Sequence, residues 1–132
     1  MQLRNNLYTV TEKKVDGLMG HFVLALNPSC FIYQAHFPGE PITPGVCIVQ
    51  MGKELLEDRL GEALQKKVEL EIIKIKNVKF LSVISPEETT VITYQMMKVE
   101  ISEYGSEVKA QMVVVSGVEA KAKISLVLSM TC

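Results

Sequence analysis

The sequence predicts an α+β domain in which one long helix packs on an antiparallel sheet. Three observations support this fold class: β-forming segments near the N-terminus, one helical stripe of apolar residues, and long alternating segments in the second half. The chain has 132 residues, which suits a single domain over residues 1–132.

The N-terminal part of the chain has the composition of short strands. Residues 7–10 and 20–26 are rich in β-forming side chains, and Asn27-Pro28-Ser29 is a turn signal. A short apolar stretch, residues 30–33, follows. The next segment is a loop that carries three prolines: Pro38, Pro41 and Pro44.

The helix is predicted to begin in this loop. Thr43 is its expected N-cap and Pro44 its first residue, while Gly61 is the expected stop, with Arg59 in the last turn. Apolar positions at helical spacing form one stripe, made of Ile48, Val49, Gly52, Leu55, Leu56 and Leu60.

The opposite face of this helix is polar. It carries Gln50, Glu54 and Glu57, with Cys47 close by. We expect Glu54 and Glu57 to be solvated carboxylates, and Cys47 to be a small buried hydrophobe.

The second half of the chain is predicted to be antiparallel strands. Residues 68–72 alternate, and the alternation changes phase at Ile73, which indicates a bulge. Residues 91–99 are strand-like. Residues 108–114 and 118–128 alternate on either side of a turn, so they predict a hairpin with one buried face.

Composition excludes several classes of protein. The formal net charge of -1 lacks the basic excess of a nucleic-acid-binding protein, and no apolar run is long enough to cross a bilayer. The N-terminus shows no secretory signal. The three cysteines are scattered and fit neither a disulfide framework nor a metal site, so we expect a cytoplasmic protein without a metal.

The loop before the helix is the segment that indicates chemistry. It places His36 on a proline-braced loop ahead of a helix N-terminus, where the first backbone N–H groups lack partners within the helix. Gly45 leaves its N–H open to a ligand. A histidine beside such a donor suits removal of a proton alpha to a carbonyl.

This segment closely resembles the signature of the 3-hydroxyacyl-acyl-carrier-protein dehydratases. The similarity covers His36-Phe37-Pro38-Gly39, Pro41 and Pro44-Gly45-Val46, with further similarity at residues 26–28, Phe31, residues 77–81, Val83 and Pro86. It extends over most of the chain. The resemblance implies a hot-dog fold, a homodimer or dimer of dimers that pairs sheets edge to edge, and an acyl tunnel beside the helix.

The resemblance also implies roles for individual residues. His36 matches the base that takes the alpha proton, Gly45 matches the glycine whose N–H polarises the thioester carbonyl, and the acid position falls on Gln50. We expect Gln50 to lie close to the partner subunit's His36. Neighbouring residues are expected to contact the substrate: Phe37, Pro38, Gly39, Pro44, Val46, Cys47 and Glu54.

Glutamine at the acid position leaves several hypotheses open, because an amide cannot deliver a proton by titrating. In one hypothesis, Gln50 orients the substrate and His36 moves the proton alone. In another, Glu54, one helical turn further along, supplies the acid.

Three functions are compatible with these residues. The first is dehydration of a 3-hydroxyacyl thioester, on acyl-carrier protein or coenzyme A, to the trans-2-enoyl thioester without a cofactor. The second is thioester hydrolysis with Glu54 activating water, and the third is a non-catalytic acyl-binding or partner subunit.

Overall fold

The structure, a computed structural model, describes residues 2–35 and 39–132. Its strands are β1 (Tyr8–Asp16), β2 (Met19–Leu26), β3 (Glu69–Phe80), β4 (Val91–Ile101), β5 (Glu107–Ser116) and β6 (Glu119–Thr131). Its helices are the short α1 (Phe31–Ala35), an element that the sequence analysis did not predict, and the long α2 (Gly45–Leu64).

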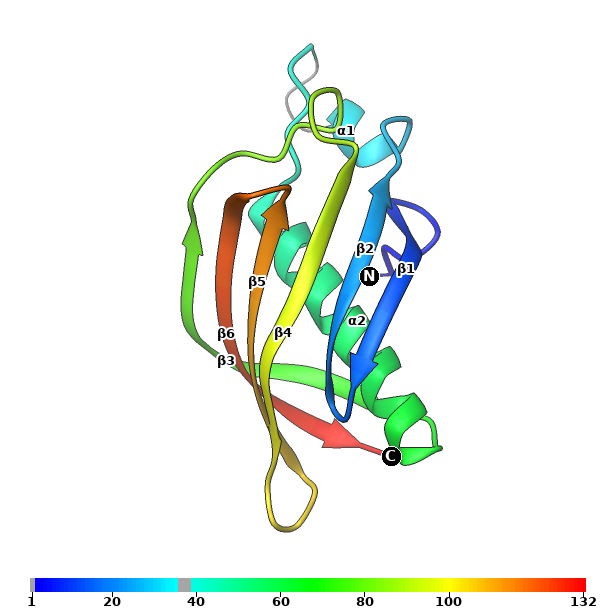
Figure 1. Cartoon of the computed structure of the whole chain (residues 1–132), viewed down its shortest axis with the longest axis vertical. Helices are drawn as coiled ribbons and strands as arrows, with labels where there is room; N and C mark the ends of the chain where they lie inside the picture. The colour runs from blue at the N-terminus through cyan, green and yellow to red at the C-terminus, as the bar shows by residue number, and fades with distance from the viewer. Residues whose placement is uncertain (1, 36–38) are drawn as a thin grey trace.

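In the described part of the chain, the strands form one antiparallel sheet in the order β1-β2-β4-β5-β6-β3. The sheet curves around α2, which lies along its inner side (Figure 1). β3 follows α2 in the chain but pairs with β6, so β1 and β3 form the two edges. The predicted α+β class, with a long helix wrapped by an antiparallel sheet, is confirmed.

The core lies between α2 and the sheet. The apolar stripe predicted on the helix is buried, and Leu55, Leu56 and Leu60 are at most 1% exposed. The sheet contributes side chains from alternate positions of its strands, because successive side chains of a strand point to opposite faces. The predicted hairpin is β5 and β6, and every second residue from Val108 to Val114 is buried.

Both ends of the helix differ from the prediction. Pro44 is the N-cap, and the Thr43 hydroxyl instead forms a 2.9 Å hydrogen bond with the Tyr33 hydroxyl inside the protein. The helix continues past Gly61 to Leu64, and Gln65 ends it in a left-handed conformation. A glycine within a helix weakens it without stopping it, which is why Gly61 was a poor stop signal.

The bulge predicted near Ile73 is confirmed. The register between β3 and β6 shifts between Ile72 and Lys74, and again between Ile75 and Asn77. Bulges increase the local twist of a strand. None of the described helices has the length and apolar character that a membrane crossing needs.

Gly52 lies where α2 packs on β4 and β5, and its small size is needed there. An added Cβ would lie 2.4 Å from Met112 Sδ and 3.4 Å from Tyr94 Cε2. Both side chains are buried, and the Tyr94 hydroxyl donates a 2.6 Å hydrogen bond to the Ile48 carbonyl oxygen.

Gly52→Ala is therefore expected to lower the free energy of unfolding by about 1–2 kcal/mol, since overpacking outweighs the better helix propensity of alanine. Denaturant titration measures this change. Gly61→Ala is the matched control in the same helix, because its Cβ would come only to 3.3 Å from the Lys66 carbonyl oxygen. Equal effects of the two substitutions would contradict the packing argument.

Candidate active site

The sequence-predicted site residues fall into two groups. His36, Phe37 and Pro38 lie outside the described residues. Gly39 and Pro44 lie in the loop that leads to α2, while Gly45, Val46, Cys47, Gln50 and Glu54 lie in the first half of that helix. The residues in α2 lie near one another because they are close in sequence on the same helix.

The start of α2 offers hydrogen-bond donors. The Pro44 carbonyl oxygen accepts from the N–H groups of Cys47 at 3.0 Å and Ile48 at 3.1 Å, which begins the helix. Within the described residues, nothing accepts a hydrogen bond from the N–H of Gly45 or Val46. These two groups sit at the positive end of the helix dipole, so they suit an oxygen that gains negative charge.

Phe80, at the end of β3, packs against Gly45. A Cβ added at Gly45 would lie 2.7 Å from Phe80 Cζ and 2.9 Å from Cε2. The sequence analysis used Phe80 only as part of the resemblance and assigned it no role. A contact between residues so far apart in the chain has no local sequence signal.

Gly45→Ala is expected to push the Phe80 ring aside and to lower any activity that uses the Gly45 N–H. The fold should tolerate the change, because Phe80 is 52% exposed and its ring can move outward. Thermal unfolding and turnover of the same preparation would separate the two effects. In a Phe80→Ala background the added methyl group has room, so much of the loss should disappear; an equal loss in both backgrounds contradicts this account.

Gln50 and Glu54 are joined on the polar face of the helix. Gln50 Nε2 donates a 2.9 Å hydrogen bond to Glu54 Oε2. Glu54 is fully buried, and its carboxylate also accepts from Leu3 N, Arg4 N and Tyr8 Oη, each at 2.9 Å. The expectation that Glu54 is a solvated carboxylate is therefore wrong, because the N-terminal segment folds over this part of the helix.

Glu57 is also more enclosed than expected. It is partly buried, and its carboxylate accepts a 2.9 Å hydrogen bond from the backbone N–H of Leu70 at the start of β3. Both carboxylates of the predicted polar face thus hold other parts of the chain against α2.

Burial raises the pKa values of two groups at the candidate site, Tyr8 beside α2 and Cys47 within it. Burial and the nearby Glu54 carboxylate raise the pKa of Tyr8 far above its usual value, so its hydroxyl remains a donor to Glu54. Burial also raises the pKa of the Cys47 thiol, with a further increase from Cys30. Cys47 is 3% exposed, which confirms its prediction as a small buried side chain.

Exposed apolar side chains surround the start of α2. The Thr43 N–H donates a 2.8 Å hydrogen bond to the Ile84 carbonyl oxygen, which brings the segment after β3 beside the helix start. Large apolar residues in these segments are at least half exposed: Val46, Phe80, Leu81 and Val83.

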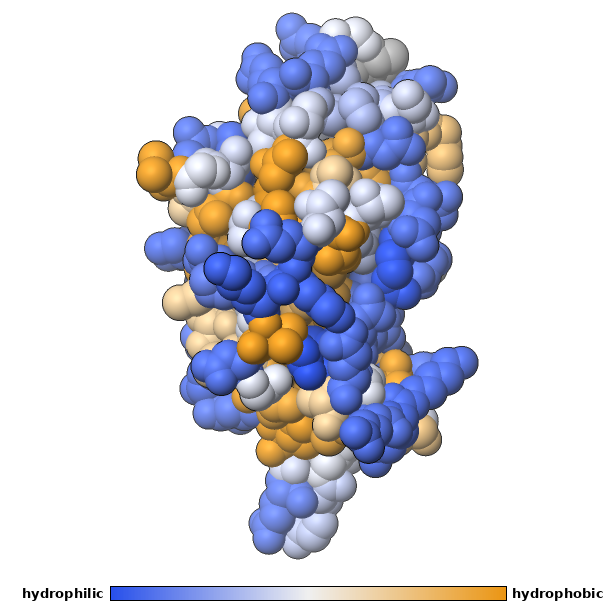
Figure 2. Space-filling model, turned by 45° about the vertical axis from the view of Figure 1, so that its right-hand side comes forward, coloured by the Kyte–Doolittle hydropathy of each residue, from blue (hydrophilic) through white to orange (hydrophobic). Residues whose placement is uncertain are grey.

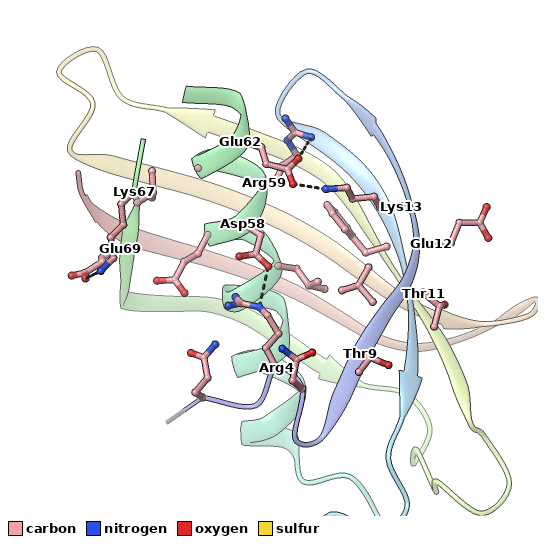
Figure 3. A pocket seen from close by; sticks show the side chains of 18 of the residues that line it. Arg4, Thr9, Thr11, Glu12, Lys13, Asp58, Arg59, Glu62, Lys67 and Glu69 are labelled. Carbon is pink, nitrogen blue, oxygen red and sulfur yellow. Dashed lines mark hydrogen bonds and ion pairs between the residues drawn. The ribbon is translucent and has the colours of Figure 1, made fainter. Parts of the chain in front are cut away.

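A separate cavity of about 840 Å³ lies between β1 and the C-terminal half of α2 (Figure 3). Two ion pairs cross it: Arg4 Nε with Asp58 Oδ2 at 3.0 Å, and Lys13 with Glu62. Burial raises the pKa of Asp58 against the opposing effect of Arg4, whereas the hydrogen bond from Lys13 lowers the pKa of Glu62. None of the sequence-predicted site residues that the structure describes lines this cavity.

On the face shown in Figure 2, apolar side chains form separate groups between hydrophilic ones. Among the described side chains, no group of three from His, Cys, Asp and Glu is placed to hold a metal ion. The described polar groups of the candidate site are therefore helix N–H donors, the Gln50 amide and the Glu54 carboxylate.

Comparisons with solved structures confirm a hot-dog fold. The dehydratase heterocomplex ApeI:P from Xenorhabdus doucetiae matches with a TM-score of 0.63 and 14% identity, over 92% of this chain and 97% of that one. The thioesterase HI1161 from Haemophilus influenzae matches with a TM-score of 0.65 and 12% identity, over 96% of this chain and 80% of that one. Comparison with curated proteins gives no match.

The protein thus has a hot-dog fold, which it shares with the structures of a dehydratase heterocomplex and a thioesterase. It belongs to the ApeI-like family, described as ApeI dehydratase, whose family model matches residues 11–118. The matched region contains all the sequence-predicted site residues, from His36 to Glu54.

Proposed function

We propose that this protein is a hydro-lyase that removes water from a 3-hydroxyacyl thioester and forms the trans-2-enoyl thioester. The acyl group is carried on acyl-carrier protein or coenzyme A, in lipid biosynthesis in the cytoplasm. The observation that carries the proposal is the start of α2 at Gly45, nine positions after His36 in the sequence, with two backbone donors available to a carbonyl oxygen. Membership of a dehydratase family supports it.

In this proposal each step uses a group of the chain. The His36 imidazole takes the proton from C2 of the acyl chain while the Gly45 N–H donates to the thioester carbonyl oxygen, where negative charge develops. The C3–O bond then breaks, and the electron pair of the former C2–H bond forms the C2–C3 double bond. The leaving hydroxyl takes the proton back from the imidazolium and departs as water, because the Gln50 amide has no proton to give by titration.

We also propose that the active form is a homodimer joined along β3. β3 is an edge of the sheet, and Ile73 and Ile75 on it are more than half exposed. An unpaired edge with apolar side chains favours pairing with another strand. Light scattering after size-exclusion chromatography tests this, and a monomer at micromolar concentration would contradict it.

Hydration of trans-2-enoyl thioesters, the reverse reaction, tests the proposed activity. The conjugated double bond absorbs in the ultraviolet, so its loss reports hydration directly. Carrier-protein and coenzyme A thioesters of short to long chains should be compared. Absence of hydration for every substrate would reject the dehydratase proposal.

A second candidate function is a non-catalytic subunit that supports an active partner. The observation that favours it is Gln50 at the acid position, and one solved relative is a dehydratase heterocomplex. Such a subunit would bind acyl thioesters and show no turnover alone. Thioester hydrolysis is less well supported, because the Glu54 carboxylate accepts four hydrogen bonds in a fully buried position and is not placed to activate water.

A further inference from the structure

The Glu54 carboxylate connects the N-terminal segment of the chain to Gln50. Its two oxygens accept from Leu3 N, Arg4 N and Tyr8 Oη on one side and from Gln50 Nε2 on the other. Leu3, Arg4 and Tyr8 lie 46 to 51 positions before Glu54 in the chain, whereas Gln50 lies four positions before it, about one helical turn away. A single buried side chain therefore contacts both elements.

We propose that Glu54 is a positioning residue that fixes the orientation of the Gln50 amide. A carboxylate that accepts from three other donors attracts the NH₂ end of an amide and repels the carbonyl end. The nitrogen of Gln50 therefore faces Glu54, at 2.9 Å, and the carbonyl oxygen Oε1 is directed away from it. The two ends of an amide are nearly equivalent in shape, so a hydrogen bond to a carboxylate is the kind of contact that distinguishes them.

The N-terminal segment holds Glu54 in place. Glu54 and Tyr8 are both 0% exposed, so neither can exchange its partner for water. The Arg4 guanidinium adds a 3.1 Å hydrogen bond from Nη2 to the Glu54 carbonyl oxygen, and its Nε lies 3.0 Å from Asp58 Oδ2. Residues 3–8 are consequently part of the support for Gln50, although they lie far from it in sequence.

The fixed amide implies a substrate preference, and this step rests on the proposed function. If Gln50 occupies the acid position, its Oε1 is an acceptor that suits the O–H of a 3-hydroxyacyl chain. A 3-oxoacyl chain has no donor at that carbon and would meet Oε1 with its own oxygen. Sites built to bind a hydroxyl reject analogues that lack it, because the polar group of the site is left unpaired. Glu54 would thus set selectivity for 3-hydroxyacyl over 3-oxoacyl thioesters.

The geometric part of the proposal can be tested without any activity. The side-chain amide signals of Gln50 in a ¹⁵N–¹H spectrum, assigned by their loss in Gln50→Ala, are compared between wild type, Glu54→Gln and Glu57→Gln. We expect Glu54→Gln to move these signals and Glu57→Gln to leave them in place, since Glu57 contacts Leu70 instead. Unmoved signals in a folded Glu54→Gln protein would overturn the proposal.

Tyr8→Phe covers the case in which Glu54→Gln does not fold. It removes one donor from the carboxylate but keeps the carboxylate and the ring. A smaller shift of the Gln50 signals is expected, and no shift would overturn the role of the N-terminal segment.

The functional part is tested by kinetics on the same variants. Glu54→Gln is expected to lower kcat on the order of 10-fold or more with little change in KM, because a misplaced group near the reacting atoms affects the rate more than binding. Glu54→Gln should also bring the inhibition constants of 3-oxoacyl and 3-hydroxyacyl analogues closer together, because the preference for the hydroxyl group is weakened. Glu57→Gln should change neither quantity. An unchanged ratio would overturn the selectivity role of Glu54.

The two parts can fail separately. If the Gln50 signals move in Glu54→Gln but wild type turns over no thioester, the positioning role is supported and the dehydratase proposal is rejected. If wild type is active and Glu54→Gln leaves the signals, kcat and the inhibition ratio unchanged, the dehydratase proposal stands and the positioning role is rejected.

Discussion

Replacing Glu54 with alanine is expected to lower the free energy of unfolding by about 3–5 kcal/mol, because it strips partners from several buried groups at once. The substitution leaves the backbone N–H groups of Leu3 and Arg4 and the Tyr8 hydroxyl without their acceptor. It also leaves a cavity beside Tyr8, which is 0% exposed. Denaturant titration at neutral pH measures the change.

Glu57→Ala is the control for this prediction. Glu57 lies one turn further along α2 and accepts only the Leu70 N–H in a partly buried position, so a loss of about 1 kcal/mol is expected. A Glu54→Ala protein as stable as Glu57→Ala would show that the N-terminal segment contributes little to the fold. Proteolysis should also begin in residues 2–8 of Glu54→Ala, since that segment loses its attachment to α2.

Replacing His36 with alanine is expected to lower the rate of thioester dehydration by about 10²–10⁴-fold, the usual contribution of a general base. The fall should appear in kcat, because the proposed imidazole acts on the reacting C2–H bond and not on binding of the acyl chain. Steady-state hydration of enoyl thioesters measures it.

His21→Ala provides the matched control, since the chain has two histidines. His21 lies on β2 opposite Gln95 of β4, and its side chain is exposed. Activity is expected to survive this change and thermal stability to change little. If both variants retain activity, His36 is not the base.

The strand pattern could be predicted well from sequence because it is local. Residues 118–128 alternate over a long run, and the structure places all of them except the exposed Val118 in β6, with Ala122, Ile124 and Leu126 buried. The apolar stripe of the helix is local in the same sense, since residues three and four apart share one face. The phase change at Ile73 likewise marked a real bulge.

The ends of α2 could not be predicted as well, because tertiary contacts decide them. Thr43 has the composition of an N-cap, but its hydroxyl is bound by Tyr33, ten residues earlier. Gly61 has the composition of a stop, but the helix runs to Leu64 and reverses at Gln65. In each case a competing interaction or conformation overrode a local preference.

The role of Glu54 was the largest error in reasoning from sequence about the candidate site. A carboxylate on the polar face of an amphipathic helix is usually solvated. Here it is buried by donors from residues 3, 4 and 8, about 50 positions away. Nothing in the local pattern of α2 indicates that an N-terminal segment will cover it. The contact between Gly45 and Phe80 was missed for the same reason.

The placement of β3 at the sheet edge has a consequence for synthesis of the chain on the ribosome. β3 ends at Phe80, but β6, the strand with which it pairs, begins only at Glu119. During synthesis β3 therefore has no pairing partner until the last strand has left the ribosome. Exposed strands of nascent chains are prone to aggregate. A chain that is truncated by a nonsense mutation before Glu119 lacks β6, so its β3 stays unpaired. Such chains are expected to be degraded by proteases or to aggregate, and not to accumulate as partly folded proteins.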